Sequence, residues 1–358
     1  MTIDLNALGW NSRLEEAFAA FAGGSVEPAR VALEHTHIYR VLSRSGESLA
    51  RVSGRLRHHA SNRVDFPAVG DWVAIESVAG NDATIHAVLP RSSRFSRRAA
   101  GDATEEQILA ANIDIVFLVS GLDGDFNLRR IERYLVVAWD SGATPVVVLN
   151  KADLVEDVDS IVREVRASSP GVDVHAVSSR QPATLDALRT YLGRGRTGAL
   201  LGSSGVGKSS IVNQLIGREL LKTRDVRESD SRGRHTSTAR QLVMLPDHGV
   251  LIDTPGMREL QLWESGEAVA GAFNDIEERA ADCRFRDCQH RTEPGCAVRA
   301  AVEAGEIPAE RLESYYKLAA EQAFQARQRD ERGLIEEKRR GRIGAKALRN
   351  VLKDKGKS

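Results

Sequence analysis

Cysteine is scarce in this chain, and long apolar runs are missing. Only three cysteines occur in 358 residues, which excludes the disulfide framework that stabilises many small secreted domains. No segment approaches roughly 18 consecutive uncharged apolar residues, so the sequence predicts no membrane span. The first ten residues contain no basic stretch followed by an apolar run, so no signal peptide is expected. These absences favour a cytoplasmic enzyme or regulator.

The chain also lacks an excess of charge of either sign. Its 50 Lys and Arg residues balance 50 Asp and Glu residues, which gives a formal net charge of zero. A general attraction to nucleic acid is therefore excluded, and such binding must rest on local clusters. Basic, aromatic-poor clusters fit contact with RNA phosphates, although a charge run is more often only a solvated face. The clusters are Arg91, Arg94, Arg97 and Arg98, and the tail 338–357 with nine Lys or Arg against one Asp.

The stretch from about residue 31 to 100 alternates apolar and polar residues over short runs. The runs cover 37–41, 49–52, 71–75 and 83–88, and clusters of Gly, Asn and Asp separate them. Four or five short strands in fewer than about 70 residues favour a small all-β domain, and a barrel of the OB type fits the pattern. We therefore predict an N-terminal extension with a short helix at 1–30 and an OB-fold domain at 31–100.

From residue 113 onward, predicted strands alternate with predicted helices. The run at 113–119 is almost continuously apolar, as expected for a strand that is covered on both faces. Further strands are predicted at 145–149, 172–177, 199–201, 241–245 and 250–253, with helices at 128–139, 155–168, 184–192 and 208–215. This alternation predicts an α/β domain with a parallel, doubly wound sheet at 101–262.

A complete phosphate-loop pattern begins at Gly202, after a predicted strand and before a predicted helix. Its glycines allow backbone N–H groups to surround phosphate oxygens, Lys208 adds charge at the β and γ phosphates, and Ser209 offers a hydroxyl to Mg²⁺. A plain Gly-rich turn is the alternative, which the complete pattern in this context disfavours. The predicted phosphate-binding residues are Gly202, Ser203, Ser204, Gly205, Val206, Gly207, Lys208, Ser209 and Ser210.

The motif Asn150-Lys151-Ala152-Asp153 lies at a predicted strand end, which is the binding edge of such sheets. The carboxylate of Asp153 can accept hydrogen bonds from the N1–H and the 2-amino group of guanine together. Adenine offers neither donor, and a site with an unpaired polar group rejects a ligand strongly. Asn150, Lys151 and Asp153 therefore favour GTP over ATP. Ser178, at the end of the next strand, is predicted to make a backbone contact to the base.

The order of the motifs differs from that of ordinary GTPases. There the phosphate loop comes first, the Asp-Thr-Pro-Gly element second and the guanine motif third. Here the guanine motif comes first and Asp253-Thr254-Pro255-Gly256 last. The parts are complete, so the order indicates a circular permutation, which is feasible because domain termini commonly lie close together. Asp253 is predicted to hold Mg²⁺ through water, and the amide of Gly256 to meet the γ-phosphate.

The residue after Gly256 is Met257, not the glutamine that positions the attacking water in many GTPases. A thioether cannot orient water, so either hydrolysis is slow until a partner helps or another group takes this role. His235, within the charged segment 222–240, is the candidate catalytic group. The alternative is that His235 is an exposed loop residue that contacts a partner. The Mg²⁺ shell could be completed by Thr236, Ser237 or Thr238.

All three cysteines lie within fourteen residues, together with a histidine, in the pattern C-x4-C-x-H-x5-C. Three thiolates and one imidazole suit tetrahedral Zn²⁺ without an open position, which indicates one structural ion. The stretch has too few large apolar residues to fold around its own core, so metal would supply that stability. Accidental clustering of three reduced thiols is the alternative. The predicted zinc ligands are Cys283, Cys288, His290 and Cys296.

These features together resemble the RsgA (YjeQ) family of bacterial circularly permuted GTPases, which depend on the small ribosomal subunit. The resemblance covers nearly the whole chain except residues 1–30. It implies an OB domain, a permuted GTPase domain, and a zinc-binding α-helical domain with a basic C-terminal helix at 263–358. The family's first-switch pattern, Gly-Arg/Lys-His-Thr-Thr, is matched by Gly233-Arg234-His235-Thr236, with Ser237 departing at the second Thr. It implies that His235 is catalytic, and it leaves either Thr236 or Ser237 to complete the Mg²⁺ shell.

The resemblance also implies a function. It predicts a monomeric GTP hydrolase that acts late in 30S maturation, binds 16S rRNA and leaves the subunit on hydrolysis. Hydrolysis by the free protein is expected to be slow, and the small subunit is expected to stimulate it. One alternative is an RNA-binding module that holds GTP with negligible turnover. Another is a GTPase that acts on a different RNA, because basic patches bind the phosphate backbone and do not distinguish one RNA from another.

Overall fold

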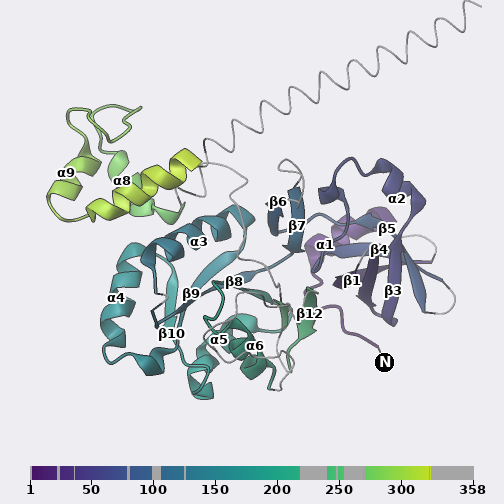
Figure 1. Ribbon diagram of the computed structural model, residues 1–358. Coiled ribbons are helices and arrows are strands. Elements are labelled where there is room, and N and C mark those ends of the chain that lie inside the picture. Colours follow the sequence, from purple (N-terminus) through teal and green to yellow (C-terminus); the bar gives the residue numbers. More distant parts are fainter. Residues whose placement is uncertain are drawn as a thin grey trace, which may run out of the picture. The chain divides into compact units, whose positions relative to one another are not determined.

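The computed structural model describes most of the chain, which divides into two compact units, 1–261 and 262–358 (Figure 1). The phosphate loop, the guanine motif and the four predicted metal ligands lie within the described part. None of the helices there combines the length and apolarity that crossing a bilayer requires. His235, Thr236, Gly256 and the basic tail lie outside the described residues. The structure describes residues 2–21, 25–35, 37–78, 81–98, 106–124, 126–217, 240–246, 249–253, 269, 271–321 and 323.

A closed five-stranded barrel occupies the N-terminal region, as the alternating runs predict. The strand order is β1-β2-β3-β5-β4, and pairing of β1 with β4 closes the barrel. Buried Val31, Tyr39, Val41 and Ile75 are part of its core. A short helix, α2 (Gly54–His59), connects β3 to β4. The strands are β1 (Val26–His35), β2 (Ile38–Ser43), β3 (Gly46–Val52), β4 (Trp72–Val78) and β5 (Asp82–Val88).

Strand β1 begins at Val26, inside the segment that we predict as an extension. Glu27 and Pro28 interrupt the apolar alternation there, and this hides the first half of the strand from a search by periodicity. The predicted short helix in this segment is present as α1 (Ser12–Phe18), and the side chain of Asn11 caps it by accepting the N–H of Leu14.

The GTPase region forms an α/β sheet with the order β10-β9-β8-β11-β13-β12. Every neighbouring pair is parallel except β12 with β13, where a short connection makes an antiparallel hairpin. The prediction of a purely parallel sheet is therefore wrong in one place, because β12 runs antiparallel to β13. The strands are β8 (Ile115–Gly121), β9 (Thr144–Asn150), β10 (Asp173–Ala176), β11 (Thr197–Leu201), β12 (Gln241–Met244) and β13 (Val250–Asp253).

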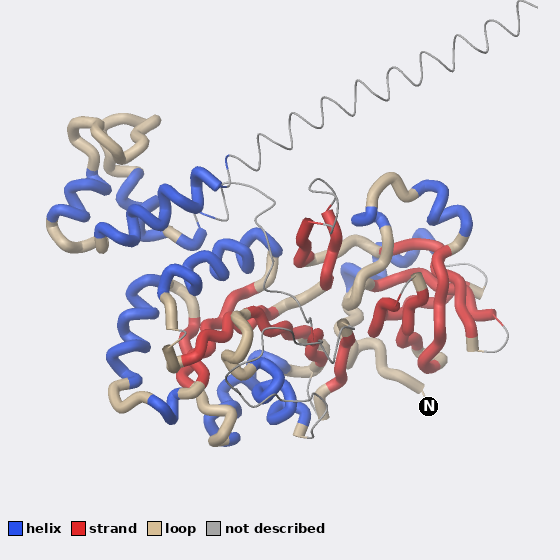
Figure 2. Tube along the Cα trace, viewed as in Figure 1, coloured by secondary structure: helices blue, strands red, loops and turns tan. Residues whose placement is uncertain are grey.

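Helices cover both faces of this sheet (Figures 1 and 2). Helices α3 (Leu128–Ser141) and α4 (Val158–Ser168) lie on one face, and α6 (Lys208–Ile216) lies on the other. The helix predicted at 184–192 is instead three short turns, η4 (Pro182–Leu185), α5 (Asp186–Arg189) and η5 (Thr190–Leu192). Leu185, Leu188 and Leu192 from these turns are fully buried. The burial of these leucines therefore stabilises the segment more than the hydrogen bonds of a regular helix do.

The barrel and the GTPase sheet belong to one compact unit. Strand β1 pairs with β12 through Leu33 and Gln241, which makes a continuous eleven-stranded sheet. A separate hairpin of β6 (Arg94–Arg98) and β7 (Glu106–Ala111) lies between them in sequence. The chain thus passes from the barrel through this hairpin into β8.

Arg30 is a buried cation that joins three segments of this unit. Its side chain donates to the carbonyl oxygens of Leu8, of Gly70 at 3.2 Å and of Asn112 at 3.1 Å. Its guanidinium carbon lies 5.6 Å from the ring centroid of Trp72. Burial lowers the pKa of Arg30 to about 10, so the side chain stays charged at neutral pH. Arg30 therefore fastens the N-terminal segment and the barrel to the segment that enters β8.

The second unit is small and largely helical. Its core includes Phe273, Ile276, Val298 and Leu318, and buried Arg311 holds Asp275 through two bonds of 2.7 and 2.6 Å. The helices are α8 (Asn274–Ala280), α9 (Ala297–Glu303) and one at 309–321.

Replacing Arg30 tests whether its hydrogen bonds hold the N-terminal segment, the barrel and the segment before β8 together. Arg30→Met retains much of the apolar volume but leaves three buried carbonyl groups without these donors. We expect the free energy of unfolding to fall by at least about 3 kcal/mol, since each such loss costs about 1–3 kcal/mol. Denaturation followed by tryptophan fluorescence measures the change. Arg44→Met, in the exposed turn between β2 and β3, should alter it by less than about 0.5 kcal/mol. Equal stability of the two variants would contradict this role.

Candidate nucleotide and metal sites

The predicted phosphate loop follows β11 and leads into α6, as the motif requires. Gly205 and Gly207 have φ values of 80° and 94°, which side chains rarely adopt. A Cβ atom at Gly202 would lie 2.2 Å from the carbonyl oxygen of Val119, so only glycine fits there. The ammonium of Lys208 donates to the carbonyls of Gly202 and Ser203, both at 2.6 Å.

Exposure differs along the loop. Ser204 and Gly205 are exposed, whereas Val206 is buried and serves as the loop's anchor in the core. Ser209 and Ser210 lie half-buried in the first turn of α6. The N–H groups of this turn and the helix dipole favour an anion at this end of α6. The loop therefore has the glycines, the cation and the helix terminus that a phosphate site needs.

Asn150 connects the guanine motif to the phosphate loop. It is fully buried at the end of β9. Its amide nitrogen donates to the carbonyl of Val206 at 2.7 Å, and its amide oxygen accepts the N–H of Ser179 at 3.1 Å. A Cβ atom at Gly207 would lie 2.3 Å from the same amide nitrogen, so the loop approaches Asn150 as closely as glycine allows. The base motif and the phosphate loop thus form one site at the carboxyl edge of the sheet.

Asp153 and Ser178 come together beside this joint. The hydroxyl of Ser178 donates to Oδ1 of Asp153 at 2.6 Å, and Arg180 lies 3.7 Å from its Oδ2. The backbone N–H of Ser178 donates to the hydroxyl of Thr184 at 2.9 Å. These contacts orient the carboxylate that we predict to read guanine.

Lys151 forms an ion pair with Asp123, which follows β8 at the same sheet edge. Lys151 has a left-handed backbone with φ of 63°. Sequence reasoning did not identify Asp123. A signal was present, because Asp123 is a polar residue directly after a buried strand, where parallel strands place their binding groups.

The predicted Mg²⁺ ligands are only partly described. Ser209 lies in the first turn of α6, and Asp253 ends β13, the strand next to β11. Because β11 and β13 are parallel neighbours, both strands end at the same edge of the sheet. Thr236, His235 and Gly256 lie outside the described residues.

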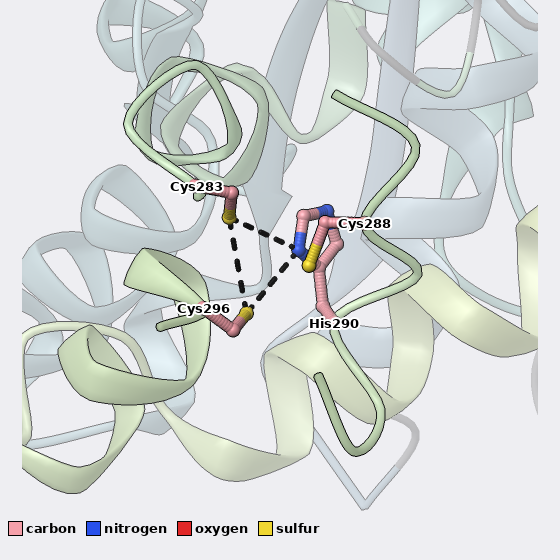
Figure 3. A group of neighbouring side chains, drawn as sticks. All are labelled: Cys283, Cys288, His290 and Cys296. Carbon is pink, nitrogen blue, oxygen red and sulfur yellow. Dashed lines mark hydrogen bonds between the residues drawn. The ribbon is translucent and has the colours of Figure 1, made fainter. Parts of the chain in front are cut away.

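The four predicted metal ligands of the second unit converge (Figure 3). All four ligand atoms lie within 4.8 Å of one another. The Sγ atoms of Cys283 and Cys296 are 3.8 Å apart, and Nδ1 of His290 lies 3.6 and 3.4 Å from them. Thiolates bound at about 2.3 Å in a tetrahedron are about 3.8 Å apart. The spacing fits a tetrahedral metal ion.

The loop that carries these ligands is held by Glu293, which sequence reasoning missed. Its carboxylate accepts the N–H groups of Gln289 at 3.0 Å, Arg291 at 2.8 Å and Thr292 at 2.9 Å. Hydrogen bonds from its own N–H and from these neighbours lower the pKa of Glu293 to about 2. Burial lowers the pKa of His290, which favours the neutral imidazole that metals bind.

One of the two predicted basic clusters is partly structural. Arg91 forms two bonds of 2.8 and 2.7 Å with buried Asp71 and donates to the carbonyls of Val64 and Phe66. Arg94 lies 3.8 Å from Glu106 on the paired strand. Arg91 therefore stabilises the barrel, and its charge is neutralised rather than presented to RNA.

Comparisons with known proteins agree with this geometry. A family model described as RsgA GTPase matches residues 88–263. A relative from Opitutus terrae, named small ribosomal subunit biogenesis GTPase RsgA, is 50% identical over 336 residues, which cover 91% of this chain and 92% of the relative. A relative from Lactiplantibacillus plantarum, named small ribosomal subunit biogenesis GTPase RsgA 2, is 45% identical over 325 residues and covers 91% of each chain.

Solved structures show the same architecture. The crystal structure of YjeQ from Thermotoga maritima matches with a TM-score of 0.65 and 28% identity, over 83% of this chain and 99% of that one. The structure of YloQ, described as a circularly permuted GTPase, matches in fold with a TM-score of 0.62 over 84% of this chain and 96% of that one. The order of motifs, the sheet and the identity to relatives along nearly the full chain lead to one assignment: the chain belongs to the RsgA family of circularly permuted GTPases.

Proposed function

We propose that this protein is a GTP hydrolase that acts in late maturation of the 30S ribosomal subunit, where it binds 16S rRNA and is released on hydrolysis. The observation that carries the proposal is the joint at Asn150, which places a guanine motif and a phosphate loop in one site. The names of the relatives, small ribosomal subunit biogenesis GTPases, support the choice of the small subunit as partner.

The residues of the site take distinct roles in this proposal. Residues 202–210 surround the phosphates, and Lys208 exchanges its carbonyl partners for β and γ oxygens. Ser209, Asp253 and Thr236 would hold Mg²⁺, which when bound neutralises charge on those oxygens. The amide of Gly256 would contact the γ-phosphate. His235 takes the catalytic position next to the attacking water, because Met257 cannot orient it.

Base selection is tested at Asp153. In Asp153→Asn the amide nitrogen can no longer accept from the 2-amino group of guanine, but it can donate to the 2-oxo group of xanthine. We expect GTP affinity to fall at least about 100-fold and XTP binding to appear. Displacement of a fluorescent guanine nucleotide by GTP, ATP and XTP measures this.

Asp159→Asn, an exposed change on α4, is the matched control and should keep the preference for GTP. Tight ATP binding by the unaltered protein would contradict guanine selection. Unchanged GTP affinity in Asp153→Asn would remove this residue from the base site.

RNA contact is supported by a basic surface on the barrel that the sequence clusters did not include. Residues 48–64 contain no acidic side chain, and Arg51, Arg55 and Arg57 are exposed. Within the part of the chain that the structure describes, none of the three forms an ion pair. His58 and His59 are exposed beside them in the last turn of α2. Unneutralised cations gathered in this way suit a phosphate backbone.

The first experiment is steady-state GTP hydrolysis with and without purified small ribosomal subunits, with large subunits as the comparison. We expect slow turnover alone and strong stimulation by small subunits only. Arg55→Glu/Arg57→Glu should reduce the stimulation and weaken its dependence on salt, because fewer counterions are released on binding. His235→Ala should abolish turnover while nucleotide binding persists.

The pair Arg163→Glu/Arg166→Glu, exposed on α4, makes the same change in net charge and should leave the stimulation intact. Stimulation by large subunits alone would point to another RNA. No turnover under any condition would favour a GTP-holding RNA-binding module.

We also propose that the cluster in the second unit holds one structural Zn²⁺. Cys296→Ser removes a buried ligand, so we expect loss of bound zinc and of protease resistance in 262–358. Elemental analysis and limited proteolysis measure both effects. Nucleotide binding by the first unit should remain. Thr292→Ala, an exposed change in the same loop, should retain the metal. A Cys296→Ser protein that keeps zinc would exclude this ligand set.

A further inference from the structure

Helix α3 brings an arginine to the phosphate loop that no motif includes. Strand β8 pairs in parallel with β11, so α3 begins at the same sheet edge where the loop follows β11. The side chain of Asn127 caps α3 and accepts the N–H of Arg130 at 3.1 Å, which fixes this residue in the first turn. From there the guanidinium of Arg130 donates to the hydroxyl of Ser203.

Two cations therefore contact the same residue of the loop. Arg130 binds Ser203 through its hydroxyl, and Lys208 binds it through its carbonyl at 2.6 Å. Like charges gathered at one loop raise the local positive potential and repel each other. An anion beside both cations lowers this repulsion, and the nucleotide phosphates are the anion of the proposed site.

The position of Arg130 in its helix supports the same conclusion. The first turn of α3 contains Arg129 and Arg130 and no acidic residue. Cations are unfavourable at this end, because the helix dipole is positive there. The neighbouring Arg129 lies 3.2 Å from a carboxylate oxygen of buried Glu132, and Arg130 contacts the loop. Negatively charged phosphates at this edge of the sheet would offset the unfavourable interaction of Arg130 with the helix dipole.

We propose that Arg130 is a positioning residue of the phosphate loop, which holds Ser203 in place and whose charge favours a nucleoside triphosphate over a diphosphate. The proposal rests on the proposed GTP site and deepens it. The triphosphate carries more negative charge than the diphosphate, so the charge of Arg130 contributes more to its binding. The hydrogen bond to Ser203 orders the loop for either nucleotide and so contributes equally to both.

The test compares the dissociation constants of GDP and of a non-hydrolysable GTP analogue, the β,γ-imido triphosphate. Arg130→Ala should weaken the triphosphate analogue by about tenfold and GDP by about threefold. Arg130→Lys keeps the charge and should restore most of the triphosphate preference. Ser203→Ala keeps the charge but removes the hydrogen bond, so it should weaken both nucleotides equally, by about twofold.

Arg163→Ala, an equal change of charge at an exposed site on α4, serves as the control and should alter neither constant. Thermal unfolding without nucleotide shows that each variant is folded. The ratio of the two constants is decisive, because a merely structural role would weaken both nucleotides alike. An unchanged ratio in Arg130→Ala would overturn the proposal. A failure of the unaltered protein to bind either guanine nucleotide would instead reject the proposed function itself.

Discussion

The contact on which the nucleotide site depends is the buried amide of Asn150. Its two hydrogen bonds, to Val206 and to Ser179, tie together loops that follow three different strands. These loops are far apart in sequence and share only the carboxyl edge of the sheet. Because the amide is fully buried, loss of either partner would leave a polar group unsatisfied. The same constraint explains Gly207, since any side chain there would occupy the space of the amide.

The site depends on contacts between loops that are distant in sequence, and this explains why circular permutation is tolerated. The sheet needs β8 beside β11 and β11 beside β13, and each pair forms whichever strand comes first in the chain. Permutation changes what is covalently connected to each edge. Here the last strand, β13, ends at Asp253, and the second compact unit begins at residue 262. The remainder of the Asp-Thr-Pro-Gly motif therefore lies in the short stretch of sequence that connects the two units.

The sequence predicted those parts of the molecule that local patterns specify. Buried strands such as β8 and β9 are continuous apolar runs, and the cluster from Cys283 to Cys296, which converges in the structure, has a recognisable spacing within one segment. Residues whose partners are distant in sequence were missed. Arg130 meets Ser203 only through the pairing of β8 with β11, and Arg30 meets Asn112 only through the folded barrel. Strand β1 was seen only in part, because Pro28 and charged neighbours obscure its alternation.

The net charge of the chain is zero, but its arginines have different roles, which their contacts in the structure show. Arg30 is buried among carbonyl groups, and Arg311 is buried beside the carboxylate of Asp275. Both side chains therefore stabilise the unit to which they belong. Arg91 belongs with them, although its place in a basic run suggested RNA contact. Arg55 and Arg57 remain exposed without a carboxylate partner among the described residues. Arg130 lies between these extremes, half-buried at the phosphate loop, where a cation retains strength because solvent screens it less. The surroundings of each arginine, and not the total number of charges, therefore determine which of them stabilise the fold and which face solvent or the phosphate loop.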